Sequence, residues 1–249
     1  MPVNLENYTE ISSFLKEKNV TLVAVSKTKP VEDILELYHL GQRDFGENYV
    51  QELLEKYEKL PRDIRWHFIG HLQSKKVKLI APFVHLIQSV DSEKLLKEIN
   101  KEGKKNNRVI RCLLQVYIAK EESKFGIEDT ELEELTARIL GTNYTNSKEK
   151  DTDISDANTI SSESDRSCPN VSLKGLMGMA SVTDDKEMVR KEFSFLKSLF
   201  DKYSKLQSAN YKLEILSMGM SGDYKMAIDE GSNMVRIGSL LFGERIPKG

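Results

Sequence analysis

The sequence predicts an α/β protein built as a single (β/α)8 TIM barrel with an extra N-terminal helix. Short runs rich in β-branched residues alternate with longer runs whose apolar residues recur at helical spacing, which favours a parallel sheet covered by helices. Eight such strands can be counted in 249 residues, and this number and length are typical of a β/α barrel. An open doubly wound sheet uses the same units and is the alternative.

The elements follow one another in a regular order. A helix over 5–18 comes first, and we expect it to cap the bottom of the barrel. Strands are expected at 21–26, 43–46, 65–70, 84–90, 109–118, 173–179, 212–218 and 234–243. Apolar residues at i, i+3 and i+4 spacing indicate helices around 34–38, 53–57, 77–80, 95–99, 132–139, 193–200 and 226–228.

Residues 141–171 interrupt this alternation. They are dense in Ser, Thr, Asn and Asp and hold few large aliphatic residues, so they bury too little apolar surface to offset the entropy of ordering. We expect a disordered insertion within one domain that spans residues 1–249. Its place before the sixth strand puts it at the N-terminal face of the barrel, opposite the mouth where active sites lie.

Charge and composition argue against several classes of protein. The chain has 37 Lys and Arg against 39 Asp and Glu, a formal charge of −2, which argues against nucleic-acid or anionic-membrane binding. No apolar run is long enough to span a membrane, and the first residues do not resemble a signal peptide. Cys112 and Cys168 show no metal-ligand spacing, so we expect a cytoplasmic protein without a structural metal.

Lys27 is the first candidate for chemistry. It follows an apolar strand, and the carboxyl ends of barrel strands form the catalytic mouth. Apolar surroundings and the neighbouring cation Lys29 favour the neutral amine that Schiff-base chemistry requires. Taken alone, the pattern also fits a solvated lysine at a strand end.

The last two strands end in glycine and serine. Strand seven continues into SMGMSGD (217–223), and strand eight carries VRIGS (235–239). Loops at these two places in a barrel commonly hold a phosphate through backbone N–H groups and hydroxyls. Together with Lys27, they predict a phosphorylated ligand whose carbonyl reacts with an amine. Pyridoxal phosphate fits that description.

Seven segments resemble those of the pyridoxal phosphate homeostasis protein family: VAVSKTKP (23–30), FGENYVQE (45–52), WHFIGHLQSKK (66–76), SKFGI (123–127), GLMGMAS (175–181), SMGMSGDYKMAI (217–228) and VRIGSLLFGER (235–245). They cover almost the whole chain outside 141–171. That family is similar to the N-terminal barrel of alanine racemases, the fold-type III group. The resemblance implies a pyridoxal 5'-phosphate-binding protein that acts in intracellular vitamin B6 homeostasis and cofactor supply.

The resemblance also implies a set of site residues. Lys27 matches the family's cofactor lysine and would hold the cofactor as an aldimine. Ser221 precedes Arg236 by fifteen residues, as the phosphate serine precedes the arginine at the pyridine nitrogen in alanine racemases. The implied cofactor-binding set is Lys27, Asn48, Met179, Ser217, Ser221, Arg236, Gly238 and Ser239. Ser221 would bind the phosphate together with the amides of Gly238 and Ser239. Ser217 would orient Arg236, and Asn48 and Met179 would line the cofactor; His71 and Lys124 are secondary candidates.

Arg236 bears on the chemistry that the resemblance implies. A guanidinium cannot accept a proton, so the pyridine nitrogen opposite it stays unprotonated and the ring is a poor electron sink. Racemisation tolerates this but needs acid/base groups on both faces of the α-carbon. In racemases a further domain donates the second group, and this sequence ends six residues after Gly243; Val31 also replaces the racemases' phosphate-binding tyrosine. We therefore expect a monomeric carrier with little or no catalysis, which supplies apo-forms of pyridoxal phosphate enzymes.

Two other functions are alternatives: an active pyridoxal phosphate-dependent amino-acid racemase and a barrel isomerase of sugar phosphates. An isomerase needs a catalytic carboxylate at a strand end, and the candidate, Glu47, is expected beside Asn48 as part of the cofactor lining. His67 and His71 do not share one helix face, so we expect no metal site there. No partner for His39 or His85 is evident from the sequence.

Overall fold

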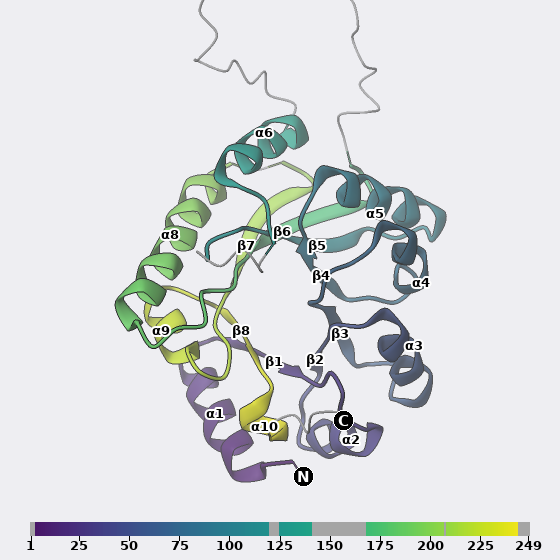
Figure 1. Ribbon diagram of the computed structural model, residues 1–249. Helices are drawn as coiled ribbons and strands as arrows, with labels where there is room; N and C mark the ends of the chain where they lie inside the picture. Colours follow the sequence, from purple (N-terminus) through teal and green to yellow (C-terminus); the bar gives the residue numbers. More distant parts are fainter. Residues whose placement is uncertain (1–2, 120–124, 141–167, 207, 244–249) are drawn as a thin grey trace, which may run out of the picture.

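The computed structural model describes residues 3–119, 125–140, 168–206 and 208–243. Eight parallel strands form a closed barrel in sequence order, and β8 pairs with β1 to complete it (Figure 1). Closure of the sheet confirms the predicted (β/α)8 barrel and excludes the open doubly wound alternative.

The strands are β1 (Thr21–Val25), β2 (Asp44–Glu47), β3 (Arg65–Phe68), β4 (Leu86–Val90), β5 (Ile110–Gln115), β6 (Val171–Met177), β7 (Tyr211–Ser217) and β8 (Met234–Ile237). The helices are α1 (Leu5–Glu17), α2 (Val31–His39), α3 (Val50–Lys59), η1 (Ser74–Lys76), α4 (Val77–Ile80), α5 (Glu93–Lys105), α6 (Asp129–Leu140), α8 (Lys186–Ser204), α9 (Tyr224–Asp229) and α10 (Ser239–Phe242). Each predicted strand thus has a counterpart in the structure.

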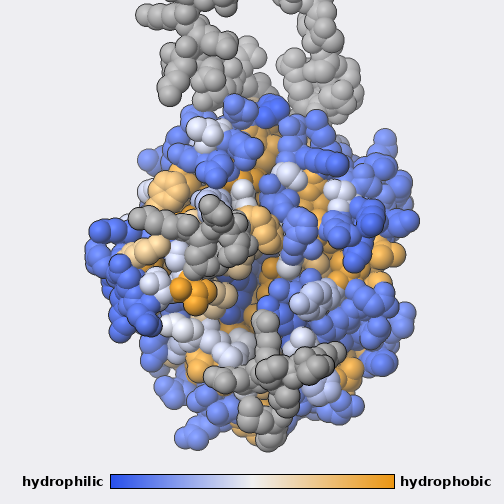
Figure 2. Space-filling model, in the orientation of Figure 1, coloured by the Kyte–Doolittle hydropathy of each residue, from blue (hydrophilic) through white to orange (hydrophobic). Residues whose placement is uncertain are grey.

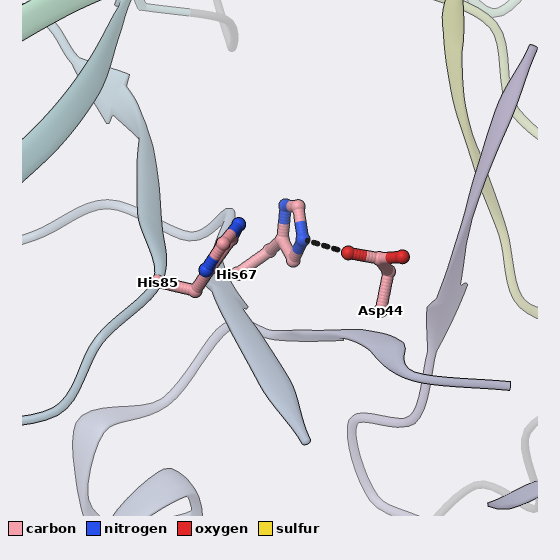
Figure 3. A group of neighbouring side chains, drawn as sticks. All are labelled: Asp44, His67 and His85. Atoms are coloured by element: carbon pink, nitrogen blue, oxygen red, sulfur yellow. Dashed lines mark hydrogen bonds and ion pairs between the residues drawn. The ribbon is translucent and has the colours of Figure 1, made fainter. Parts of the chain in front are cut away.

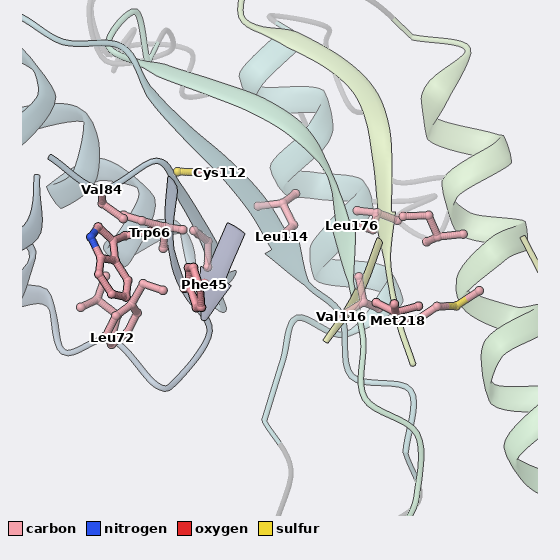
Figure 4. Packing of buried hydrophobic residues seen from close by; sticks show 14 of the residues in the cluster. Phe45, Trp66, Leu72, Val84, Cys112, Leu114, Val116, Leu176 and Met218 are labelled. Carbon is pink, nitrogen blue, oxygen red and sulfur yellow. The ribbon is translucent and has the colours of Figure 1, made fainter. Parts of the chain in front are cut away.

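The hydrophobic core has two parts because successive side chains of a strand point to opposite faces of the sheet. The larger part lies between the strands and the outer helices, where Phe45, Trp66 and Leu114 are buried (Figure 4). The smaller part fills the inside of the barrel, with Val23 and Leu113 among its members. The inside of the barrel is therefore a packed core and not a ligand-binding channel.

The eighth strand is shorter than predicted. It ends at Ile237, and residues 239–242 form α10, whose Leu241 and Phe242 amides donate to the carbonyl of Gly238 at 2.9 Å. A short apolar run has no periodicity that separates a strand from a helix, so the sequence could not place this boundary. The fifth strand also ends early, at Gln115.

The N-terminal helix does not cap the bottom of the barrel, contrary to the expectation. Asn4 N–H donates to the carbonyl of Leu241 at 2.8 Å, and Asn7 Nδ2 donates to that of Leu240 at 3.0 Å. The helix α1 therefore starts beside α10, near the carboxyl end of β8, and runs along the outside of the barrel to the start of β1 (Figure 1). Because α10 is only four residues long, α1 covers the wall that a full eighth helix would cover.

The predicted insertion falls mostly outside the described residues, since 141–167 are not described. Its expected end is wrong by a few residues: Val171 is the first residue of β6, and the Asn170 amide donates to Asn100 Oδ1 at 2.9 Å. This attachment to α5 fixes the entry into β6.

Hydrophilic residues dominate the periphery of the face in Figure 2, and hydrophobic residues show mainly nearer its centre. Among the described helices, none combines the length and the apolar character needed to cross a membrane.

Candidate functional site

A cavity of about 280 Å³ opens at the carboxyl ends of the strands. It is lined by Val25, Lys27, Lys29, Asn48, Ile69, Met179, Met220, Ser221, Gly222, Arg236, Gly238, Ser239 and Gly243. Seven of the eight residues expected from the sequence are among them; Arg236 lies in β8, and the others lie in the segments that follow β1, β2, β6, β7 and β8. The eighth, Ser217, lies behind Arg236 and does not line the cavity.

The cavity is electropositive. Lys27, Lys29 and Arg236 line it, and its described lining includes no Asp or Glu. The Lys29 ammonium donates to the carbonyl oxygen of Phe242 at 2.5 Å, which holds the start of α2 against the end of α10. A cavity with this charge favours an anionic ligand.

A buried cluster between the sheet and α3 holds the backbone that carries Lys27. Lys56 Nζ, on α3, donates to the carbonyl of Ser26 at 2.7 Å and lies 2.8 Å from Glu47 Oε1. Ser26 Oγ donates to the same Glu47 oxygen at 2.5 Å, and Glu52 Oε1 accepts from the Thr28 amide at 2.6 Å. Thr28 has φ of +65°, a conformation that non-glycine residues rarely adopt. These contacts hold the turn that presents Lys27.

Glu47 is therefore not part of the cofactor lining, contrary to the expectation. Adjacent strand residues face opposite sides of the sheet, so Asn48 faces the cavity while Glu47 faces α3 and is completely buried. Burial raises the pKa of the Glu47 carboxyl to about 7, although Lys56 and Ser26 oppose this shift. The sequence signal for the cluster was limited to the i, i+4 spacing of Glu52 and Lys56, which is common on exposed helix faces.

Arg236 is held rigidly at the floor of the cavity. Its side chain is buried, Nη1 donates to Ser217 Oγ at 2.7 Å, and Nη2 donates to the carbonyl of Gly178 at 2.9 Å. The contact with Ser217 agrees with the orienting role expected for that serine. Burial lowers the pKa of the guanidinium to about 10, so Arg236 is still a cation at neutral pH.

The loops after β7 and β8 bring hydroxyl and amide groups together. The Gly238 amide donates to Ser221 Oγ at 3.3 Å, and both residues line the cavity. The turn that leads from β7 to Ser221 depends on Gly219, whose φ is +97° and where a Cβ would lie 2.6 Å from that of Ala227. This pair of loops can bind an oxyanion through N–H and O–H donors.

Of the secondary candidates, His71 is exposed beside Asp91, with Nδ1 3.0 Å from a carboxylate oxygen, and does not line the cavity. Lys124 lies outside the described residues.

A second polar cluster, Asp44, His67 and His85, lies at the opposite end of the barrel (Figure 3). His85 does have partners: its ring lies 5.5 Å from that of His67, and Nε2 is 2.9 Å from Arg111 Nη1. Potential ligand atoms of the three residues lie within 4.8 Å of one another. However, Arg65 occupies both carboxylate oxygens of Asp44, and two nearby guanidiniums oppose a divalent cation.

Comparisons with known proteins agree with this architecture. The protein-family model of the alanine racemase N-terminal domain matches residues 5–147 and 154–246 of this chain. A pyridoxal phosphate homeostasis protein of Aquifex aeolicus is 40% identical over 230 residues, 92% of this chain and 89% of that protein. The human protein of the same name is 38% identical over 234 residues, 90% of this chain and 76% of that protein.

Solved structures of this family and of alanine racemases share the barrel fold of this chain. PipY of Synechococcus elongatus, with PLP bound, is 29% identical, has a TM-score of 0.77, and matches 96% of this chain and 99% of its own. Alanine racemase of Streptomyces coelicolor is 14% identical with a TM-score of 0.64, over 93% of this chain and 56% of its own. The latter likeness concerns the fold alone.

Proposed function

The chain belongs to the pyridoxal phosphate homeostasis protein family, and we propose that it binds pyridoxal 5'-phosphate at the barrel mouth and acts in vitamin B6 homeostasis and cofactor supply. The observation that carries the proposal is the convergence of Lys27, Ser221 and Arg236 on one electropositive cavity from the ends of β1, β7 and β8.

The residues present fit this cofactor. Lys27 would hold it through its amine, Ser221 and the amides of Gly238 and Ser239 would bind its phosphate, and Arg236 would face the pyridine nitrogen. Phosphate is well matched to N–H and O–H donors beside cationic side chains. When bound, the cofactor supplies an aldehyde that reacts reversibly with a primary amine.

Two further observations support the fit. Asn48 Oδ1 is buried, and no hydrogen-bond partner for it is present in the described part of the chain, although buried polar atoms are normally paired. Because Asn48 lines the cavity, a ligand there would supply the missing donor or a bridging water. At Gly222 a Cβ would meet nothing within 4 Å, so the loop borders open space.

The same residues favour a carrier with little or no catalysis. Arg236 can only donate, so it gives the pyridine nitrogen no stable proton and leaves the ring a poor electron sink. Racemisation would need a second acid/base group opposite Lys27. The described lining offers no His, Tyr, Asp, Glu or Cys for that role. The isomerase alternative loses its carboxylate, because Glu47 is buried away from the cavity.

Absorbance spectroscopy tests the proposal. Protein mixed with pyridoxal phosphate should show a visible band that borohydride fixes to Lys27, and Lys27→Ala should abolish the band. Lys29→Ala is the matched control, since it removes a second amine of the same cavity and should keep the band at saturating cofactor. A coloured Lys27→Ala protein, or loss of the band in Lys29→Ala alone, would refute the assignment.

Exchange of the α-proton separates the carrier from the racemase. We expect negligible deuterium incorporation across a panel of L-amino acids in deuterated buffer, with an alanine racemase as the positive control. Rapid exchange that depends on Lys27 would favour the racemase.

The proposal includes supply of cofactor to apo-forms of pyridoxal phosphate enzymes, a monomeric state and a cytoplasmic location. The free cysteines Cys112 and Cys168 are consistent with a reducing compartment. Transfer can be followed as recovery of activity by an apo-enzyme mixed with the loaded protein, and the monomer by light scattering.

A further inference from the structure

A chain of hydrogen bonds, here called the relay, runs through the inside of the barrel from the floor of the cavity to the opposite end of the barrel. Arg236 Nη1 donates to Ser217 Oγ at 2.7 Å, and Ser217 Oγ donates to Gln88 Oε1 at 2.7 Å. Gln88 Nε2 lies 2.9 Å from His67 Nδ1, and His67 Nε2 lies 2.9 Å from Asp44 Oδ1. Five side chains from β2, β3, β4, β7 and β8 thus form one continuous path.

The two end residues, Arg236 and Asp44, each fix the direction of the bond that they make. A guanidinium can only donate, and an ionised carboxylate can only accept. Ser217 accepts from Arg236, so its own hydrogen turns to Gln88 Oε1. Gln88 then directs its NH₂ group at His67, whose Nδ1 must accept while its Nε2–H donates to Asp44. In this arrangement every group faces a partner of the opposite kind, whereas turning the Gln88 amide over would set its oxygen against the accepting Nδ1 of His67.

The lower end is anchored by a bidentate ion pair. Arg65 Nε and Nη2 donate to the two carboxylate oxygens of Asp44 at 2.8 and 2.5 Å. Despite burial, hydrogen bonds from Arg65 and His67 hold the pKa of Asp44 well below its usual range. Asp44 therefore stays an acceptor over the whole neutral range, and the orientation of His67 is set by a fixed charge.

The middle of the chain is fully enclosed. Gln88 and Ser217 are 0% exposed and His67 is 1% exposed. The remaining interior positions include Val23, Leu86, Leu113 and Met177, which are apolar. Burying a polar network costs free energy that apolar packing would not, and this network ends on Arg236.

We propose that Gln88 and His67 are positioning residues that orient the Arg236 guanidinium toward the pyridine nitrogen of the cofactor. The inference rests on the proposed function. Neither residue lines the cavity; both act through Ser217. Gln88 accepts the hydroxyl hydrogen of Ser217, so the lone pairs of Ser217 Oγ face Nη1 of Arg236. The carbonyl of Gly178 accepts from Nη2 of Arg236. The guanidinium plane is thereby held at two points.

A double-mutant cycle tests this coupling. Gln88→Met keeps the volume of the side chain and removes both hydrogen bonds of the relay. We expect it to weaken cofactor binding by about three- to tenfold, the effect of losing part or all of one hydrogen bond. In an Arg236→Met background the same change should weaken binding by less than about twofold, because the guanidinium that Gln88 orients is absent.

Equal weakening in both backgrounds, or none in either, would overturn the proposal, since a purely structural role acts independently of Arg236. Ser217→Ala removes one hydroxyl and provides the same cycle if Gln88→Met fails to fold. The matched control is Ser89→Ala, because Ser89 is buried next to Gln88 on β4 and its Oγ has no hydrogen-bond partner in the described part of the chain. It should leave binding unchanged in both backgrounds.

A direct spectroscopic readout accompanies the cycle. The ¹⁵N resonance of cofactor labelled at the pyridine nitrogen should shift in Gln88→Met and Ser217→Ala, and should keep its wild-type position in Ser89→Ala. An unshifted resonance in both relay variants would refute the positioning role even where binding in the Arg236→Met background is too weak to measure. Failure of the proposed function is distinguishable, because it would show as a wild-type protein without the Lys27-dependent band.

Discussion

Glu47 should make the stability of this protein depend on pH in a direction opposite to that of an ordinary ion-paired carboxylate. Burial raises its pKa from 4.5 to about 7, so between these values the folded state binds more protons than the unfolded state. The free energy of unfolding therefore falls as pH rises through this window. A shift of this size corresponds to about 3 kcal/mol at about 1.4 kcal/mol per pKa unit.

Glu47→Gln isolates this contribution. The amide keeps an oxygen for Ser26 and Lys56 but does not titrate. Unfolding by urea, followed by circular dichroism, should show that the stability of wild type relative to Glu47→Gln decreases by about 3 kcal/mol between about pH 4 and about pH 8.

Glu52→Gln serves as the control. Glu52 also contacts the Lys56 ammonium, at 2.6 Å, but its side chain is partly exposed. This variant should retain the contribution of Glu47 to the pH dependence, because Glu47 is unchanged. A difference between wild type and Glu47→Gln that stays constant over the whole pH range would refute the reasoning.

Three further changes have defined outcomes. Burial, and after it the charges of His67 and Arg111, lowers the pKa of His85 to about 4. The contribution of His85 to stability is therefore present above about pH 6.5 and is lost as pH falls toward 4. In urea titrations His85→Gln should lose less stability on acidification than wild type. Lys56→Met leaves the buried Glu47 carboxylate without its cation and should cost about 3–5 kcal/mol of unfolding free energy. Because Lys56 also holds the Lys27 turn, that variant should bind cofactor more weakly in an absorbance titration. Gly175→Ala would place a Cβ 1.7 Å from the Ile215 carbonyl oxygen, so thermal unfolding should show a loss of more than about 2 kcal/mol, whereas an unchanged melting temperature would contradict the close approach of β6 and β7.

Much of the fold could be predicted because it depends on local patterns. Alternating strand and helix periodicity identified all eight strands, and the (β/α)8 barrel follows from their number and order. The same logic placed Lys27, Ser221 and Arg236 at the mouth, because each lies at the carboxyl end of a strand or in the loop after it. Prediction failed where the local signal was ambiguous, as in the apolar run that became α10.

The tertiary structure alone decided which side chains meet. Glu47 turned out to support the Lys27 turn because its neighbour Asn48 faces the mouth. The bond from Ser217 to Gln88 joins residues 129 positions apart, and no local pattern encodes such a pair. It exists because closure of the barrel and the stagger of its strands bring these two inward-facing residues together. The donor-only Arg236 and the acceptor-only Asp44 lie at the two ends of the hydrogen-bonded line that this pair completes.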